Sequence, residues 1–138
     1  IMLNHVLEHL HDPIKILKDI RDIMDDKTKL IIEIPHAKDF LIDSYECESF
    51  KKFTFWSEHL ILHTETSLRN LLKIIGFSKI EVSYYQRYNI FNHLNWLNNG
   101  TPGGHKNNKI NDKNLISAYD SFLEKYEKTD TIIAYCYK

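Results

Sequence analysis

The spacing of apolar residues near the start of the chain predicts a helix followed by a buried strand. Apolar side chains recur at helical spacing from residue 13 to 25, with charged side chains on the opposite side. Asp12 and Pro13 are typical of a helix start, because Asp12 offers a side-chain oxygen and proline presets φ. Residues 29–34 (KLIIEI) are almost continuously apolar up to Pro35, which predicts a strand covered on both faces.

The same rules predict further elements along the chain. Leucine and isoleucine side chains from residue 68 to 75 form one stripe of a helix, with Thr64 or Thr66 as its cap and Gly76 as a left-handed stop. Residues 79–85 (KIEVSYY) alternate apolar and polar, as in a strand. The other expected elements are a strand end at residues 1–3, a helical turn or loop over 4–10, a helix capped by Asp112, and a strand over 131–137.

Two regions have no clean period. Residues 36–62 are rich in aromatic side chains, which predicts an ordered loop with helical turns rather than a disordered linker. Residues 86–112 hold most of the asparagines and the segment TPGGH, which predicts a long exposed excursion, helical around 91–97. This excursion is interpreted either as a lid hinged at Gly103 and Gly104 or as a floppy surface insertion.

The order of elements indicates an α/β fold. Strand, helix, strand, loop, helix and strand succeed one another, which is typical of a parallel sheet flanked by helices. The last two strands have no compelling helical crossover between them, so the final strand is expected to return antiparallel beside its predecessor. We expect one domain over residues 1–138, with a core over 1–85, an insertion and helix over 86–130, and a final strand over 131–138.

Composition restricts the function without naming it. The chain of 138 residues is long enough for one domain with a real core. Its 18 basic and 19 acidic side chains argue against coating nucleic acid or an anionic membrane, and no apolar run is long enough to span a bilayer. Cys47 and Cys136 form neither a disulfide framework nor a CxxC pair, so we expect a reducing compartment, the cytoplasm by default.

Glycine is absent from the first 75 residues, and the four glycines lie at positions 76, 100, 103 and 104. A glycine-rich phosphate or nucleotide loop is therefore excluded from the first half of the chain. The chain also opens inside an apolar run without an initiating methionine, which we interpret as a cut end.

Four segments in order carry a family resemblance. They are HVLEHLHDP at 5–13, LIIEIP at 30–35, SEHLILHT at 57–64 and SLRNLLKIIGF at 67–77. Together they resemble the second half of class I S-adenosylmethionine-dependent methyltransferases, as found in the type 11, 12 and 23 domains. The resemblance covers residues 1–85 closely, and residues 131–137 only as a final strand.

The resemblance implies the second half of a Rossmann-like sheet, with S-adenosylmethionine as cofactor. It also implies that Asn4 and His5 contact the cofactor, whereas the glycine-rich loop and the acidic residue that hold most of it precede Ile1. None of the glycines here can replace that loop, since backbone must approach the cofactor where a Cβ would collide. We therefore expect a truncated methyltransferase domain that does not transfer methyl groups alone.

Histidines concentrate in the region of the resemblance. If residues 5–9 are helical, His5, Glu8 and His9 lie on one side at a metal-ligand spacing, and His59 is the candidate fourth ligand. Small-RNA 2′-O-methyltransferases and ubiquinone-pathway O-methyltransferases carry a related Glu-x-x-Glu-His and bind a divalent ion there. Because His5 replaces the first glutamate, zinc, iron, nickel or manganese is favoured over magnesium. The alternatives are a metal-free polar edge of the active site and a structural pair.

A second resemblance uses the same residues. Sugar-modifying methyltransferases often carry Glu-His before Leu-x-x-Leu-x-x-x-Gly-Phe, and those that methylate carbon have Tyr-His-Glu-His. This chain has Glu58 and His59 at the last two positions of that motif and lacks its tyrosine and first histidine, which favours O-methylation. His59 is then the candidate general base, with Glu58 and His9 as catalytic partners, because the ordinary imidazole pKa suits proton removal.

Glu33, His36 and Trp56 are the candidate substrate-binding residues. Glu33 and His36 flank the carboxyl end of a central strand, where open α/β sheets place ligands; the alternative is that Glu33 simply faces an edge. Trp56 and Phe55 could stack on a sugar or base, but aromatic residues in a covering loop lie more often in the core. We expect a small-molecule or saccharide acceptor, no membrane or nucleic-acid partner, and self-association through an exposed sheet edge. The rivals are a metal-assisted RNA 2′-O-methyltransferase and a non-catalytic module that keeps the scaffold.

Overall fold

The computed structural model describes residues 1–106 and 112–138, and these form two compact units. The first unit comprises residues 1–36, 58–83 and 132–138, and the second comprises residues 37–57 and 84–131. Each unit is built from segments far apart in the sequence, and each is described by itself below.

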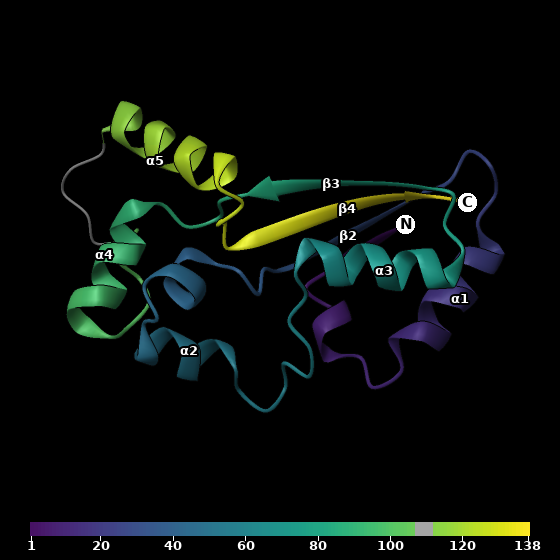
Figure 1. Cartoon of the computed structure of the whole chain (residues 1–138), viewed down its shortest axis with the longest axis horizontal. Coiled ribbons are helices and arrows are strands. Elements are labelled where there is room, and N and C mark those ends of the chain that lie inside the picture. Colours follow the sequence, from purple (N-terminus) through teal and green to yellow (C-terminus); the bar gives the residue numbers. More distant parts are fainter. Residues whose placement is uncertain (107–111) are drawn as a thin grey trace. The chain divides into compact units, whose positions relative to one another are not determined.

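A four-stranded sheet organises the first unit. Its strands are β1 (Met2–Asn4), β2 (Lys29–Pro35), β3 (Lys79–Tyr85) and β4 (Thr131–Tyr137), in the order β1-β2-β4-β3 (Figure 1). β1 and β2 are parallel, with Leu3 opposite Ile32. Ser78, directly before β3, donates a backbone hydrogen bond to Tyr137 at the end of β4, at 3.1 Å. β3 and β4 are therefore antiparallel, as predicted, and β4 lies between β2 and β3.

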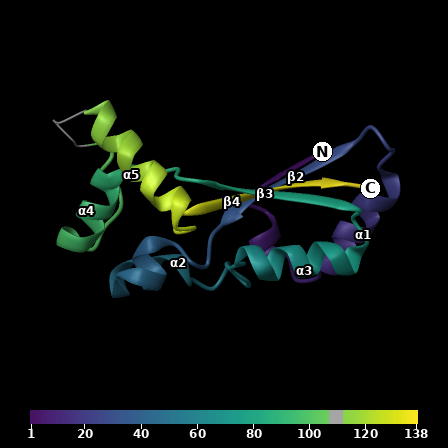
Figure 2. The ribbon, with the colours of Figure 1, turned by 45° about the horizontal axis from the view of Figure 1, so that its top comes forward.

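Helices α1 (Pro13–Ile23) and α3 (Glu65–Ile75) lie on the same side of this sheet (Figure 2). Their apolar stripes are buried, and Leu17 and Leu72 are completely enclosed. The inner face of β2 is equally buried, whereas Ile31 and Glu33 on its other face are only half-buried. The expectation of a strand covered on both faces is thus wrong, because a run of isoleucines does not distinguish a buried face from a half-exposed one.

Both helices begin and end where the sequence predicts. Asp12 accepts a hydrogen bond from the Lys15 backbone N–H at 3.0 Å and caps α1. Thr64 caps α3 in a reciprocal capping box with Ser67, which decides between the two threonines that the pattern allows. Gly76 ends α3 at φ 97°, a left-handed conformation that glycine adopts without a steric penalty.

The second unit contains helices and one π-helical turn. These are the π-helix η2 (Phe40–Ser44), α2 (Glu48–Thr54), α4 (Ile90–Asn99) and α5 (Lys113–Lys125). The predicted helix around 91–97 and the helix capped by Asp112 are confirmed. Trp96 of α4 is buried against the ring of Phe50 in α2, with ring centroids 5.2 Å apart.

Parts of the second unit differ from expectation. The side chains of Phe55 and Trp56 are exposed, so the core position favoured for such aromatic residues is wrong. The excursion is not a floppy insertion over its described part, because the Gly103 N–H donates to the Asn92 side chain and Gly104 packs against the Phe91 backbone. Residues 107–111, which include Lys109 of that excursion, lie outside the described residues.

In the described part of the chain, the helices are all too short or too polar to cross a bilayer.

Candidate functional site

The candidate site begins where β1 ends. Asn4 is the exposed last residue of β1, and His5 follows with φ 49°, its backbone N–H bonded to the Glu33 carbonyl at 2.9 Å. Only Leu7–His9 form a helical turn, the 3₁₀ helix η1. The prediction of a helix over residues 5–9 therefore holds only in part, since the left-handed backbone at His5 separates it from η1.

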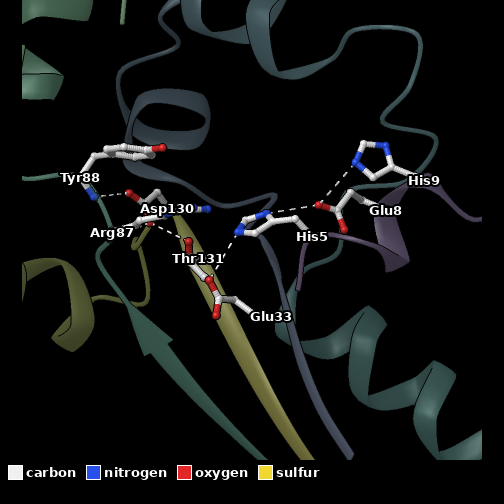
Figure 3. A network of polar contacts seen from close by, with 8 residues as sticks. All are labelled: His5, Glu8, His9, Glu33, Arg87, Tyr88, Asp130 and Thr131. Carbon is white, nitrogen blue, oxygen red and sulfur yellow. Dashed lines mark hydrogen bonds and ion pairs between the residues drawn. The ribbon is translucent and has the colours of Figure 1, made fainter. Parts of the chain in front are cut away.

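Glu8 lies at the centre of the site although its side chain is only 1 % exposed. Its Oε1 atom is 3.3 Å from Nδ1 of His5 and 3.9 Å from Nε2 of His9 (Figure 3). Neither carboxylate oxygen accepts a well-aligned hydrogen bond from the described residues. A buried carboxylate is costly without a compensating cation or proton, so Glu8 marks a place where one is expected to bind.

The ring of His9 is held in one orientation. Its Nδ1 atom lies 2.7 Å from the Glu58 backbone carbonyl, which can only accept, so Nδ1 carries the proton. In the neutral ring Nε2 then keeps its lone pair, which is free to bind a proton or a metal. The ring of His59 lies beside that of His9, with centroids 4.9 Å apart. Glu8, His9 and His59 each offer one ligand atom, and these three atoms lie within 4.8 Å of one another.

His5 plays a different part from the other two histidines. Its second ring nitrogen, Nε2, is 3.4 Å from Oε1 of Glu33, so the ring stands between two carboxylates (Figure 3). A doubly protonated ring would donate to both, which suits a bridge better than a metal ligand. Glu33 is half-buried, with 19 % of its side chain exposed, and so it neither lies in the core nor faces open solvent.

His63 is a site residue that the sequence analysis did not select. It is buried, pairs with His36 through an isolated parallel bridge, and shares a hydrogen bond with the Ser67 hydroxyl at 3.1 Å. Its Nε2 atom has no partner among the described residues. Burial lowers the pKa of His63, while the charge of Glu8 acts in the opposite direction, so the two side chains are neighbours. The only sequence signal was its place directly before the α3 cap.

The remaining candidates are distributed as follows. His36 is buried beside the carboxyl end of β2. Glu58 is exposed, and its backbone carbonyl makes the contact to His9. Trp56 belongs to the second unit, whereas the other candidates belong to the first. The structure thus brings together His5, Glu8, His9, Glu33 and His59 around the ends of β1 and β2.

A family comparison defines the class of this protein. Residues 1–82 match the family described as methyltransferase domain, and they are more than half of the 138 residues. The chain therefore belongs to the methyltransferase domain family, as the resemblance of its four segments implied. No curated protein matches the sequence.

Solved structures confirm the fold. One similar structure is an S-adenosylmethionine-dependent methyltransferase from Archaeoglobus fulgidus, at a TM-score of 0.59 and 15% identity over 99% of this chain and 57% of that one. Another, from Thermotoga maritima, is described as an S-adenosylmethionine-dependent methyltransferase and possible histamine N-methyltransferase. It matches at a TM-score of 0.60 and 18% identity, over 99% of this chain and 54% of that one. The sheet is the predicted Rossmann-like one, and the chain spans little more than half of either structure.

Proposed function

We propose that this chain is part of an enzyme that transfers a methyl group from S-adenosylmethionine to a hydroxyl of a saccharide or another small molecule. The two similar structures, both named as S-adenosylmethionine-dependent methyltransferases, support the cofactor. One observation supports a hydroxyl oxygen as the group that receives the methyl: the oriented His9 ring lies beside the His59 ring, near the end of β1. A hydroxyl must lose its proton as the methyl group arrives, and an imidazole with a free lone pair can accept it.

The roles follow from the geometry around Glu8. We assign proton removal to His59. The ring of His9 lies beside it, and the Glu58 carbonyl holds the His9 ring in place. Asn4 and His5, at the turn after β1, would contact the cofactor. Glu33 and His36, at the carboxyl end of β2, would contact the acceptor, while Trp56 of the second unit stays a prediction from the sequence. Because the methyl group is transferred in line, much of the rate would come from aligning the acceptor oxygen.

The base is tested by His59→Ala in the full-length polypeptide, with transfer of labelled methyl to hydroxyl-bearing acceptors as the readout. We expect kcat to fall about 100-fold, while the KM for S-adenosylmethionine changes little. His11→Ala is the matched control, since His11 is an exposed histidine in the same stretch of chain. Activity of His59→Ala within about twofold of wild type would exclude His59 as the base.

We propose further that these 138 residues do not bind the cofactor well by themselves. The first 75 residues contain no glycine, so they offer no glycine-rich loop whose backbone could approach the cofactor closely. Calorimetric titration of the chain with S-adenosylmethionine should detect no binding. Micromolar affinity would refute this proposal, and a full-length polypeptide that also fails to bind would favour a non-catalytic assembly module.

A metal-assisted reaction is the second candidate, favoured by the group of Glu8, His9 and His59. Two imidazoles and one carboxylate suit zinc, manganese or iron, and the buried Glu8 carboxylate, which accepts no well-aligned hydrogen bond from the described residues, fits a divalent cation. When bound, the ion would act as a Lewis acid that lowers the pKa of the acceptor hydroxyl. An RNA 2′-hydroxyl would be one acceptor for such a site.

The metal is tested by elemental analysis and by thermal shift with manganese or zinc. We expect the melting temperature to rise on addition of the metal in wild type and in His11→Ala, and not in His9→Asn or His59→Asn. No bound metal together with an unchanged melting temperature in wild type would contradict the metal site.

The proposed partners follow the same chemistry. The acceptor is a small molecule or saccharide, and the nearly balanced charge still argues against nucleic acid and membrane as principal partners. The free cysteines Cys47 and Cys136 are the ground on which we propose a reducing compartment, the cytoplasm.

A further inference from the structure

A chain of buried polar side chains crosses the second unit, and Asp130 anchors it. The Asp130 carboxylate accepts hydrogen bonds from the backbone N–H groups of Arg87 and Tyr88, both at 2.9 Å, and from the Thr131 hydroxyl at 2.8 Å (Figure 3). The Gln86 side-chain NH₂ donates to the same carboxylate at 3.1 Å. The Asp130 backbone N–H donates in turn to Oε1 of Gln86 at 3.0 Å. This pair of contacts distinguishes the oxygen of Gln86 from its nitrogen.

The orientation of Gln86 determines the tautomer of His93. The Gln86 NH₂ can only donate, and its two hydrogens are shared among the Tyr88 carbonyl at 2.6 Å, the Asp130 carboxylate and Nε2 of His93 at 3.2 Å. Nε2 of His93 is therefore the acceptor in this contact. Burial lowers the pKa of His93 to about 4, so the ring is neutral and Nδ1 carries its only N–H proton. That proton is donated to the Tyr119 hydroxyl oxygen at 2.9 Å. The hydroxyl hydrogen of Tyr119 is therefore directed at a different acceptor.

Asp39 is the neighbouring group with an unused oxygen. Its side chain is buried, and one oxygen accepts from the Leu41 backbone N–H at 2.6 Å. The other, Oδ2, is buried without a hydrogen-bond partner among the described residues. After burial itself, the charge of Asp39 is the main influence that raises the pKa of the Tyr119 phenol, and the ring of Phe40, the residue after Asp39, lies against the Tyr119 ring, so the two groups lie near one another. A donor and an acceptor thus stand together, each able to make one more hydrogen bond.

Aromatic rings surround this pair and continue to the surface. The ring of Phe40, which follows Asp39, lies near three other rings. The centroid of the Phe40 ring is 6.3 Å from those of Tyr119 and Phe122 and 5.4 Å from that of Tyr45. The side chains of Tyr45 and Phe122 are exposed, although large apolar groups gain from burial. The cluster therefore combines a solvent-facing aromatic surface with an unsatisfied polar pair beside it.

We propose that Asp39, Tyr119, Tyr45 and Phe122 form a binding site for a neutral, polyhydroxylated ligand, namely a saccharide. A hydroxyl group both accepts and donates, so one ligand hydroxyl can accept from Tyr119 and bond Oδ2 of Asp39 at the same time. The exposed rings of Tyr45 and Phe122 contact the C–H face of the sugar. An anionic ligand is disfavoured because Lys128, the nearby cation, is already paired with Asp43.

This site goes beyond the proposed methyl transfer, because it requires neither cofactor nor His59. Binding is therefore measured without S-adenosylmethionine, so that failure of the saccharide site and failure of methyl transfer are told apart. The probes are methyl glycosides of glucose, mannose and galactose. Their binding to the 138-residue chain is measured by saturation-transfer NMR and by calorimetry.

We expect at least one of these glycosides to bind at millimolar concentration, with saturation transfer from aromatic protons. Tyr119→Phe removes only the hydroxyl, and Tyr45→Ala removes a ring whose loss costs little stability because it is exposed. Each substitution should weaken binding about tenfold. Tyr85→Ala is the control, since Tyr85 is similarly exposed in the same unit but makes no ring contact with this cluster. Circular dichroism verifies that each variant is folded.

Each of three results would overturn the site. One is the absence of saturation transfer from the wild-type chain to any of the glycosides. A second is affinity unchanged in both Tyr119→Phe and Tyr45→Ala. The third is a stronger preference for the 6-phosphate of the same sugar, since the site is argued to be neutral.

Discussion

At the scale of single residues, two buried carboxyl groups set the chemistry of the molecule. Glu8 lies in the first unit between histidine rings and accepts no well-aligned hydrogen bond from the described residues. Asp39 lies in the second unit, and one of its oxygens is satisfied by a backbone N–H. A buried acid either remains protonated or is balanced by a positive charge, and the two cases respond differently to mutation and to pH.

Glu8→Gln removes the buried charge and keeps the shape of the side chain. Because the carboxylate oxygens accept no well-aligned hydrogen bond, we expect the free energy of unfolding in a metal chelator to stay within about 1 kcal/mol of wild type, or to rise. Urea denaturation measures this. Glu58→Gln is the control, as the Glu58 side chain is exposed. A loss of several kcal/mol would show instead that the charge of Glu8 is already balanced by the histidines around it.

The stability of the chain should depend on the charge of Asp39. Burial and the charge of Asp130 raise the pKa of Asp39 to about 8, above the ordinary value of 3.8. The folded chain therefore holds a proton that the unfolded chain releases, so the stabilisation is complete below pH 4 and is lost as the pH rises from 4 to 8. The slope is at most about 1.4 kcal/mol per pH unit.

Asp39→Asn cannot ionise and keeps an oxygen for the Leu41 N–H. Urea denaturation of both proteins at pH 5, 6.5 and 8 should show the variant gaining stability over wild type as the pH increases. Parallel curves for the two proteins would mean that Asp39 titrates normally.

At the scale of elements, helix α3 shows how local sequence sets both of its ends. The capping box of Thr64 and Ser67 satisfies backbone N–H groups at its start, and Gly76 ends it in a left-handed conformation. The Arg21 side chain of α1 donates to the Gly76 carbonyl at 3.0 Å, which joins the end of α3 to α1. The start of α3 directly follows His63, so the cap also supports the site near Glu8.

Thr64→Ala should cost about 1 kcal/mol of stability, because it removes the acceptor for the Ser67 N–H. The matched control is Thr66→Ala in the same helical turn, where an exposed threonine makes way for a better helix former. Thermal or urea unfolding compares the two variants with wild type. If both substitutions cost the same, the cap at Thr64 does not stabilise the chain.

At the scale of the whole molecule, β1 is an edge of the sheet. It pairs with β2 on one side, and no other described strand pairs with its second side. Ile1 and Met2 are exposed there, although both are large apolar residues. An unpaired edge with apolar side chains is a template for another strand, so this edge is where the chain is expected to associate with itself.

Met2→Lys should therefore weaken self-association, since a charged side chain on an edge strand opposes strand pairing. Sedimentation velocity over a concentration series measures the share of dimer and larger species. Ile14→Lys is the control, because Ile14 is a similarly exposed apolar residue on helix α1. Equal effects of both substitutions would indicate general hydrophobic association instead of pairing at β1, and a wild-type chain that is monomeric throughout would contradict the expectation itself.

Much of the fold could be predicted because the signals that specify it are local. Helical spacing over residues 13–25, the Asp12 cap and the Gly76 stop each depend on neighbours within one or two turns. The alternation over Lys79–Tyr85 likewise depends only on the strand itself. Where the pattern failed, as at Phe55 and Trp56, the outcome depended on which distant segment covers the side chain.

The sequence by itself determined the order of strands and helices, the family, and the concentration of histidines around Glu8. Only the tertiary structure decided how these groups meet: His9 is oriented by a carbonyl 49 residues away, and His63 pairs with His36 through an isolated parallel bridge. The same holds for the chain from Asp130 through Gln86 to His93, whose members are separated by long stretches of sequence. Hydrogen-bond partners and burial are properties of packing between distant segments, and no local pattern of residues encodes them.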